Sequence, residues 1–290
     1  MSLKGENMYV IDAHQHFWDL NQVPLPWPTP EDGQLYRAYG WDDVIPLLDA
    51  TGIDAMVLVQ AGDCREDTEF LLDIAGRHRE VAGVVGWIPL DRPHEAEPML
   101  VTHSGHPKFV GVRALIHTMP DRDWLLRPDV NAGLKILEEH QVPFDVVSVR
   151  PGELRHVRTL SERHPELRMV IDHLSKPPIG LDDWEPWRTL MRQAAENPNV
   201  FAKISGLYPA VGSLDNWDAE TVRPFIDEAL SVFGPDRLMF GSDWPVAVVA
   251  GGYVKVWEQL SRIFDELSET ERQAVLGRTA VSFYGLPAAL

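Results

Sequence analysis

The chain has 290 residues and a formal net charge of −18 at pH 7, which argues against binding to nucleic acids or anionic membrane surfaces. Hydrophobic residues make up 44% and charged residues 24% of the chain, as in ordinary soluble globular proteins. The single cysteine, Cys64, excludes an internal disulfide and suits a reducing cytoplasm. We expect neither a membrane span nor a signal peptide. The sequence leaves open whether the protein is a monomer or a homo-oligomer.

A short apolar run near the N-terminus is followed by two histidines. Residues 9–13 are apolar apart from Asp12, which indicates a buried strand. Side chains two positions apart on a strand point to the same face, so His14 and His16 are expected to project together. Two neighbouring imidazoles form half of a metal site. The alternative is that each histidine simply hydrogen-bonds to the backbone.

Residues 18–40 contain four prolines, at positions 24, 26, 28 and 30, which favour extended structure. A long loop in a compact domain usually has a function of its own. Because this one directly follows the histidine pair, it is predicted to cover the face of the protein that carries the active site.

From residue 41 onward, short apolar strands alternate with amphipathic helices. The strands are predicted at residues 9–13, 55–59, 81–87, 109–113, 143–147, 167–171, 200–204 and 237–240. The helices are predicted at residues 42–51, 66–79, 95–103, 130–140, 152–164, 184–196, 219–233 and 253–264, with two more near 269–276 and 278–284. Eight such units predict one (β/α)₈ TIM barrel domain over residues 6–290. An open doubly wound sheet is the alternative, but no strand is followed by a nucleotide-binding glycine loop.

In a parallel barrel the carboxyl ends of all strands meet on one face, where active sites are built. The predicted strands end in a set of polar and aromatic residues that barrel stability does not require. In strand order these are His14 and His16; Gln60; Trp87; Arg113 with His117; Asp145 and Ser148; Asp172, His173 and Lys176; Lys203 and Ser205; Asp243 and Trp244.

Four segments together resemble the amidohydrolase superfamily. They read Ile-Asp-Ala-His-Gln-His-Phe-Trp at residues 11–18, Ile-Asp-His-Leu-Ser-Lys-Pro at 171–177, Lys-Ile-Ser-Gly-Leu at 203–207 and Gly-Ser-Asp-Trp-Pro at 241–245. More narrowly, they are similar to the amidohydrolase-2 branch, which contains sugar lactonases for L-fuconolactone and L-rhamnonolactone and a lactonase for 2-pyrone-4,6-dicarboxylate.

The resemblance implies a metal site formed by His14, His16 and Asp243, with His173 as a further possible ligand. Two departures from the metal-rich relatives imply one zinc ion at most. Strand four ends in Arg113 rather than in a lysine or glutamate that could bridge two metals. Strand five lacks a histidine ligand. Some members of the family hydrolyse lactones without a metal, so the resemblance does not decide whether zinc is required.

Lactone hydrolysis needs a base for the attacking water and a group that stabilises the oxyanion. Asp243 is the candidate base; the alternative is that its carboxylate only caps the following turn. Zinc could polarise the carbonyl. Without metal, His173 could do so together with His14 and His16.

Several rim residues are expected to contact the substrate. Arg113 could bind hydroxyls or a carboxylate, although an ion pair within the rim is equally consistent with its position. Lys176 could likewise pair with a neighbouring acid, as could Lys203. Tryptophan rings could stack on a sugar. The predicted substrate-binding residues are Trp18, Gln60, Arg113, His117, Lys176 and Trp244.

These observations predict an enzyme of carbohydrate catabolism that hydrolyses an L-fuconolactone-like aldonolactone to the aldonic acid. The alternatives are a lactonase for a pyrone dicarboxylate or a muconolactone, a decarboxylase of the same superfamily, and a non-catalytic sugar-binding barrel. Because Arg113 is the one arginine that clearly ends a predicted strand, the sequence favours a neutral small-molecule lactone over a dicarboxylate.

Overall fold

Eight parallel strands lie side by side in the order in which they occur along the chain, from β1 to β8. The structure is a computed structural model and describes residues 9–289, so residues 6–8 and 290 of the predicted domain lie outside the described part. The strands are β1 (Ile11–Gln15), β2 (Ala55–Val59), β3 (Val81–Gly86), β4 (Phe109–Ala114), β5 (Phe144–Val146), β6 (Met169–Ile171), β7 (Val200–Ile204) and β8 (Leu238–Phe240). The predicted (β/α)₈ barrel is confirmed.

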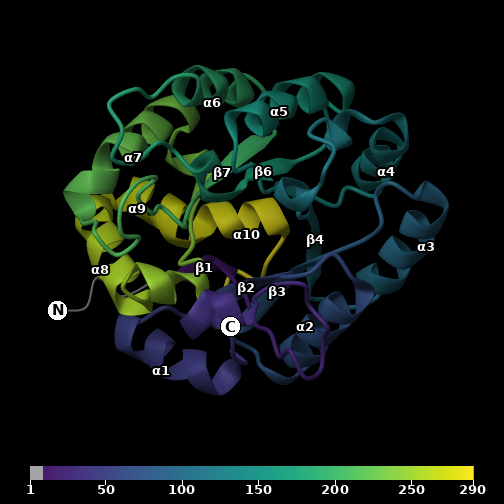
Figure 1. Ribbon diagram of the computed structural model, residues 1–290, viewed down its shortest axis with the longest axis horizontal. Coiled ribbons are helices and arrows are strands. Elements are labelled where there is room, and N and C mark those ends of the chain that lie inside the picture. Colours follow the sequence, from purple (N-terminus) through teal and green to yellow (C-terminus); the bar gives the residue numbers. More distant parts are fainter. Residues whose placement is uncertain (1–8, 290) are drawn as a thin grey trace.

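Helices surround the strands in a ring, as Figure 1 shows in a view along the barrel. They are α1 (Trp41–Thr51), α2 (Arg65–Arg77), α3 (Pro93–Ser104), α4 (Pro128–Glu139), α5 (Pro151–Arg163), α6 (Trp187–Ala195), α7 (Ala219–Phe233) and α8 (Tyr253–Phe264), followed by α9 (Glu269–Gln273) and α10 (Thr279–Tyr284). The helix predicted at 269–276 is shorter than expected, because residues 274–278 form a π-helical turn. In Figure 1, α10 crosses the middle of the ring.

The strands are buried on both faces because apolar layers lie outside and inside the barrel. On β2, Met56 and Leu58 belong to the outer layer between strands and helices, whereas Val57 and Val59 belong to the inner one. This is the alternation expected for successive strand residues. The inner layer is completed by α10, which contributes Phe283 and other side chains. The terminal helix therefore packs against the inner apolar layer of the strand ring.

The barrel closes where the ends of β1 and β8 meet. His16 N donates to the Trp244 carbonyl at 2.7 Å, and Asp243 N donates to the His14 carbonyl at 2.9 Å. The buried Asp12 carboxylate reinforces this seam, because its Oδ1 accepts from Ser242 N at 2.8 Å. These hydrogen bonds place the two N-terminal histidines directly beside Asp243.

An irregularity in β1 directs the histidines inward. Ile11 and Ala13 belong to the inner apolar layer, so strict alternation would turn His14 outward. The register between β1 and β2 instead shifts between Asp12 and Gln15. A β-bulge of this kind re-aims the side chains that follow it. The strand also begins two residues later than predicted, at Ile11 rather than at residue 9.

The segment that follows β1 contains regular structure that its prolines did not suggest. It includes a 3₁₀-helix, Pro30–Leu35. Its two ends are joined, since Trp18 N donates to the Tyr39 carbonyl at 3.0 Å and Tyr39 N donates to the Trp18 carbonyl at 2.9 Å. Within residues 9–289, no helix combines the length and apolar character needed to cross a membrane.

A buried ion pair links the strands to the terminal helix. Lys203 Nζ lies 2.6 Å from Asp145 Oδ2, and both side chains are fully buried. The Tyr284 hydroxyl of α10 lies 2.9 and 2.8 Å from the two Asp145 oxygens, to which it can donate. Burial raises the pKa of Asp145 to about 6 despite the stabilising effect of Lys203 and Tyr284 on the carboxylate.

We expect Tyr284→Phe to lower the free energy of unfolding by about 1.5–3 kcal/mol, because the variant loses a hydrogen bond to a buried charged group. Denaturant unfolding followed by circular dichroism measures the change. Tyr36→Phe is the control, since Tyr36 is 47% exposed and should leave stability unchanged. Equal stability of both variants would show that the hydroxyl of Tyr284 does not support the barrel.

Candidate active site

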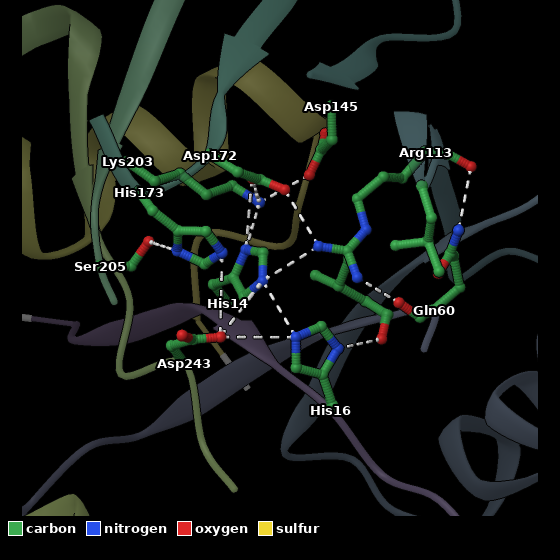
Figure 2. Close-up of polar contacts among 12 residues, drawn as sticks. His14, His16, Gln60, Arg113, Asp145, Asp172, His173, Lys203, Ser205 and Asp243 are labelled. Atoms are coloured by element: carbon green, nitrogen blue, oxygen red, sulfur yellow. Dashed lines mark hydrogen bonds and ion pairs between the residues drawn. The ribbon is translucent and has the colours of Figure 1, made fainter. Parts of the chain in front are cut away.

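Three imidazoles and one carboxylate meet at the carboxyl ends of the strands, as Figure 2 shows. His14 Nε2 lies 3.2 Å from His16 Nε2, and His16 Nε2 lies 3.5 Å from Asp243 Oδ1. The Nε2 atoms of His14 and His173 each lie 3.9 Å from the same oxygen. All four residues are buried. The predicted metal and catalytic residues are therefore brought together in one cluster.

The opposite edge of each imidazole has its own partner. His16 Nδ1 lies 2.8 Å from the Val59 carbonyl, which can only accept, so Nδ1 is protonated and donates this hydrogen bond. His173 Nδ1 lies 2.9 Å from Ser205 Oγ. His14 Nδ1 faces both Asp172 Oδ1 at 3.3 Å and Lys203 Nζ at 3.1 Å. Such outer contacts fix the orientation of an imidazole toward the centre of a site.

The donor set fits one zinc ion. Neutral imidazoles and a carboxylate are ordinary zinc ligands, and donors bound at about 2.0 Å in a tetrahedral site lie about 3.3 Å apart. The ligand atoms of His14, His173 and Asp243 all lie within 4.8 Å of one another. His16 Nε2 adjoins this group. His173, which follows β6, is thus placed at least as well for metal binding as His16. From the sequence, His16 was predicted as a ligand and His173 only as an additional one.

Burial and neighbouring charges set the protonation of the cluster. Burial lowers the pKa of His173 to about 3 and holds that of His14 well below its usual value, so both rings are neutral near pH 7. Burial would raise the pKa of Asp243, but the adjoining side chains of His173 and His16 and the Lys176 ammonium together hold it well below its usual range. Asp243 is therefore ionised.

The backbone around the cluster is strained. His173, Leu174, Ser175 and Lys176 have φ between 48° and 58°, and Asp243 has φ of 59°. The left-handed region is unfavourable for residues with a Cβ atom. Such conformations persist only where the surrounding structure enforces them, and they are concentrated at functional sites.

Gly206 provides the space in which this cluster packs. Its φ is +53°, and a Cβ atom added there would lie 2.6 Å from Asp243 Oδ2, 2.7 Å from His173 Nδ1 and 2.8 Å from Lys176 Nζ. Any side chain at this position would displace three charged or polar groups at once. Although the Lys-Ile-Ser-Gly-Leu segment drew attention to this region, its sequence did not reveal the role of the glycine.

A cavity of about 580 Å³ opens beside the cluster and is within the usual size range for small-molecule sites. Pro26 and Trp27, from the proline-rich segment, form part of its wall. The other lining residues are His16, Ala61, Asp63, Arg113, Leu115, His117, Thr118, Val147, Val149, His173, Lys176, Asp243 and Val246.

Three of the predicted substrate-binding residues line this cavity. Arg113 does so while its Nη1 lies 3.1 Å from Asp172 Oδ2, so its charge is already paired. Burial lowers the pKa of His117 to about 4, which leaves the ring neutral. Lys176 Nζ donates to the Gly206 carbonyl at 2.9 Å and lies 3.8 Å from Asp243 Oδ2.

The other three do not line the cavity, contrary to expectation. Trp18 is fully buried, and its indole N–H donates to the Arg37 carbonyl at 2.7 Å. Trp244 is also buried and packs edge-on against two aromatic rings behind the site. Gln60 has no exposed surface, and its amide donates to Asp63 Oδ1 at 2.9 Å. Position at a strand end does not decide whether a side chain faces the cavity or the layer behind it.

Asp63 and Trp27 are cavity residues that sequence reasoning missed. Asp63 follows β2 on the predicted rim, which was an available signal. No local pattern distinguished Trp27 from the other tryptophans of the chain.

Residues 11–286 match the model of the family described as Amidohydrolase. An L-fucono-1,5-lactonase from Burkholderia ambifaria is 37% identical over 280 residues, covering 94% of each chain. Another L-fucono-1,5-lactonase, from Burkholderia multivorans, is 35% identical over 287 residues, covering 96% of each chain. A solved structure of a Burkholderia multivorans amidohydrolase with bound zinc is 34% identical, has a TM-score of 0.85 and is matched over 96% of this chain and 100% of its own. The present chain belongs to the amidohydrolase family.

Proposed function

We propose that the protein hydrolyses an L-fuconolactone-like aldonolactone to the corresponding aldonic acid, in carbohydrate catabolism. The observation that carries this proposal is the ionised Asp243 carboxylate facing three imidazole Nε2 atoms at the wall of a ligand-sized cavity. The names of the two Burkholderia relatives support the choice of lactone.

Asp243 is proposed as the general base. Its carboxylate accepts a proton from the water that attacks the lactone carbonyl, and it later returns that proton to the ring oxygen as the ester bond breaks. A carboxylate with so low a pKa is a weak base in the free protein. Lys176, whose ammonium helps to hold it ionised, can instead engage the negative charge that develops on the substrate. The stabilisation of Asp243 by Lys176 then weakens, and the basicity of Asp243 rises as the reaction proceeds.

Lys176 is the proposed stabiliser of the oxyanion. Its ammonium lies at the cavity wall, and its hydrogen bond to the Gly206 carbonyl fixes its position before substrate arrives. A preorganised cation aimed at developing charge lowers a barrier without reorganising during the reaction. His117 and Arg113, which also line the cavity, are proposed to contact the substrate.

His14, His16, His173 and Asp243 are the residues that would hold a zinc ion. When bound, zinc would act as a Lewis acid toward the lactone carbonyl. The chain contributes three imidazole rings whose Nδ1 atoms contact outer partners, so that their Nε2 atoms are directed toward the same point.

The alternative functions require recognition of a carboxylate, which the cavity supports poorly. Among the described residues that line it, the lysine and arginine side chains are Lys176 and Arg113. Each already lies against an acid of the protein, Asp243 and Asp172 respectively. A pyrone dicarboxylate, a muconolactone or the carboxylated substrate of a decarboxylase would therefore find no unpaired lysine or arginine there.

Acid release from a panel of freshly prepared lactones, followed with a pH indicator, tests the reaction directly. We expect turnover of L-fucono-1,5-lactone and related sugar lactones. Turnover confined to carboxylated pyrones or muconolactones would replace the proposal with the aromatic-degradation alternative. Absence of turnover on the whole panel would favour a binding protein.

We predict that Asp243→Asn will keep the fold but reduce kcat/KM by about 10²–10⁴-fold, because an amide cannot accept the proton of the attacking water. Steady-state kinetics and circular dichroism measure the two effects. Asp182→Asn is the matched control on an exposed position. Activity of Asp243→Asn within a few-fold of the native protein would exclude Asp243 as the base.

Gly206→Ala is predicted to abolish most activity, since the new methyl group would displace Asp243, His173 and Lys176. Gly212→Ala is the control for backbone conformation. Gly212 also has a positive φ, of +83°, but an added Cβ atom there meets nothing within 4 Å. Both variants should lose about 1–2 kcal/mol of stability to the left-handed backbone conformation. Gly206→Ala should lose more because its methyl group also displaces its neighbours, and Gly212→Ala should retain native kcat/KM. Equal loss of activity in the two would show that the effect is general.

The native protein is predicted to bind about one equivalent of zinc, measured by elemental analysis after dialysis and by calorimetric titration of the metal-free protein. His173→Gln should weaken the affinity by more than the roughly 10–100-fold that follows loss of an outer hydrogen-bond partner. His94→Gln is the control, because the His94 side chain is 80% exposed. Unchanged affinity in His173→Gln would remove His173 from the proposed ligand set.

A further inference from the structure

A second carboxylate, Asp63, lines the same cavity as Asp243. It lies in the connection between β2 and α2 and is fixed from two sides. Its Oδ1 accepts from Gln60 Nε2 at 2.9 Å and from Leu115 N at 3.0 Å, and its Oδ2 lies 3.2 Å from the same backbone nitrogen. Gln60 is itself held by the Arg113 carbonyl, to which its amide donates at 3.2 Å. The position of Asp63 is thus determined by residues that follow two strands, β2 and β4.

The charge of Asp63 is not neutralised by a direct partner. Within residues 9–289, no lysine, arginine or histidine nitrogen lies within 4.0 Å of its carboxylate oxygens. Burial raises its pKa, while the hydrogen bond from Leu115, the more distant Arg113 charge and Gln60 counteract the rise. Its Oδ2 receives one long hydrogen bond, so it retains acceptor capacity.

The surroundings of Asp63 in the cavity wall strengthen any contact that it makes. Leu115, Val147 and Val149 contribute apolar surface to the same wall. Hydrogen bonds in such a low-dielectric environment are stronger than in water, and those to an ionised acceptor are stronger than those between neutral groups. A hydroxyl donor would satisfy the free acceptor capacity, whereas a second carboxylate would be repelled.

We propose that Asp63 is a specificity-determining residue that accepts hydrogen bonds from substrate hydroxyls and excludes lactones bearing a carboxylate. The inference rests on the proposed lactonase function and narrows its substrates to neutral, polyhydroxylated lactones. Gln60 then acts as a positioning residue that orients Asp63. This explains why a glutamine at a strand end is wholly buried yet belongs to the recognition apparatus.

Asp63→Asn is the test variant, because its amide oxygen can still accept from Leu115 N while the negative charge is lost. Three probes separate the effects: L-fucono-1,5-lactone, δ-valerolactone, which has no hydroxyls, and D-glucaro-1,4-lactone, which carries a carboxylate. We expect KM for the first to rise about tenfold with a smaller change in kcat. The kcat/KM for δ-valerolactone should stay unchanged, and that for D-glucaro-1,4-lactone should increase.

Asp67→Asn is the matched control from the same region. Its carboxylate accepts from Ala61 N and Gly62 N at 2.7 and 3.1 Å but does not line the cavity. This variant should alter stability without changing the preference among the three probes.

If the native protein is active and Asp63→Asn leaves the preference among the three lactones unchanged, the assignment is overturned. If Asp63→Asn reduced kcat/KM for δ-valerolactone as much as for L-fucono-1,5-lactone, the assignment would also be overturned. Such a reduction would indicate a general structural or catalytic effect. A native protein that turns over none of the three lactones would instead overturn the proposed function.

Discussion

The structure depends on a set of charges buried within the strand ring. Lys203 lies between Asp145 and Asp172, at 2.6 and 3.1 Å, and Arg113 reaches the second oxygen of Asp172. Removing such charges from water costs several kcal/mol per ion, and this cost is offset only when the partners are accurately placed. The cluster therefore constrains the relative positions of strands β4 to β7. Because Asp172 and Lys203 also contact His14 Nδ1, the same constraint fixes the first imidazole of the site.

The same hydrogen bonds close the barrel and bring the site residues together. The backbone hydrogen bonds that join β1 to β8 involve His14, His16 and Asp243 themselves. The bulge in β1 then turns both imidazoles toward the centre instead of toward the outer helices. A slip of one residue at this seam would reverse the orientation of the side chains. The register of β1 against β8 therefore fixes the relative positions of the histidines and Asp243.

Sequence patterns within single segments predicted the positions of several strands and helices. The predicted bounds of β2, β7 and α7 agree with the structure at both ends. Strand burial and helix periodicity produce patterns of apolar residues within one continuous segment, so they can be recognised without knowledge of the tertiary fold. The assembly of the histidines with Asp243 followed from strand order in a parallel barrel. The orientation of Trp18 and Gln60 could not be predicted, because it depends on partners such as the Arg37 carbonyl and Asp63, whose proximity only the tertiary fold establishes.

The left-handed run from His173 to Lys176 shows how the fold supports a strained site. Four successive residues with left-handed φ values are unfavourable in an isolated turn, so contacts with the rest of the protein must maintain this conformation. The indole of Trp187, on α6, donates to the Leu174 carbonyl at 2.7 Å from within the apolar core. On the other side, Gly206 leaves room for His173 and Lys176 to approach Asp243. The turn thereby places a neutral imidazole and an ammonium against one carboxylate, an arrangement that an extended connection after β6 would separate.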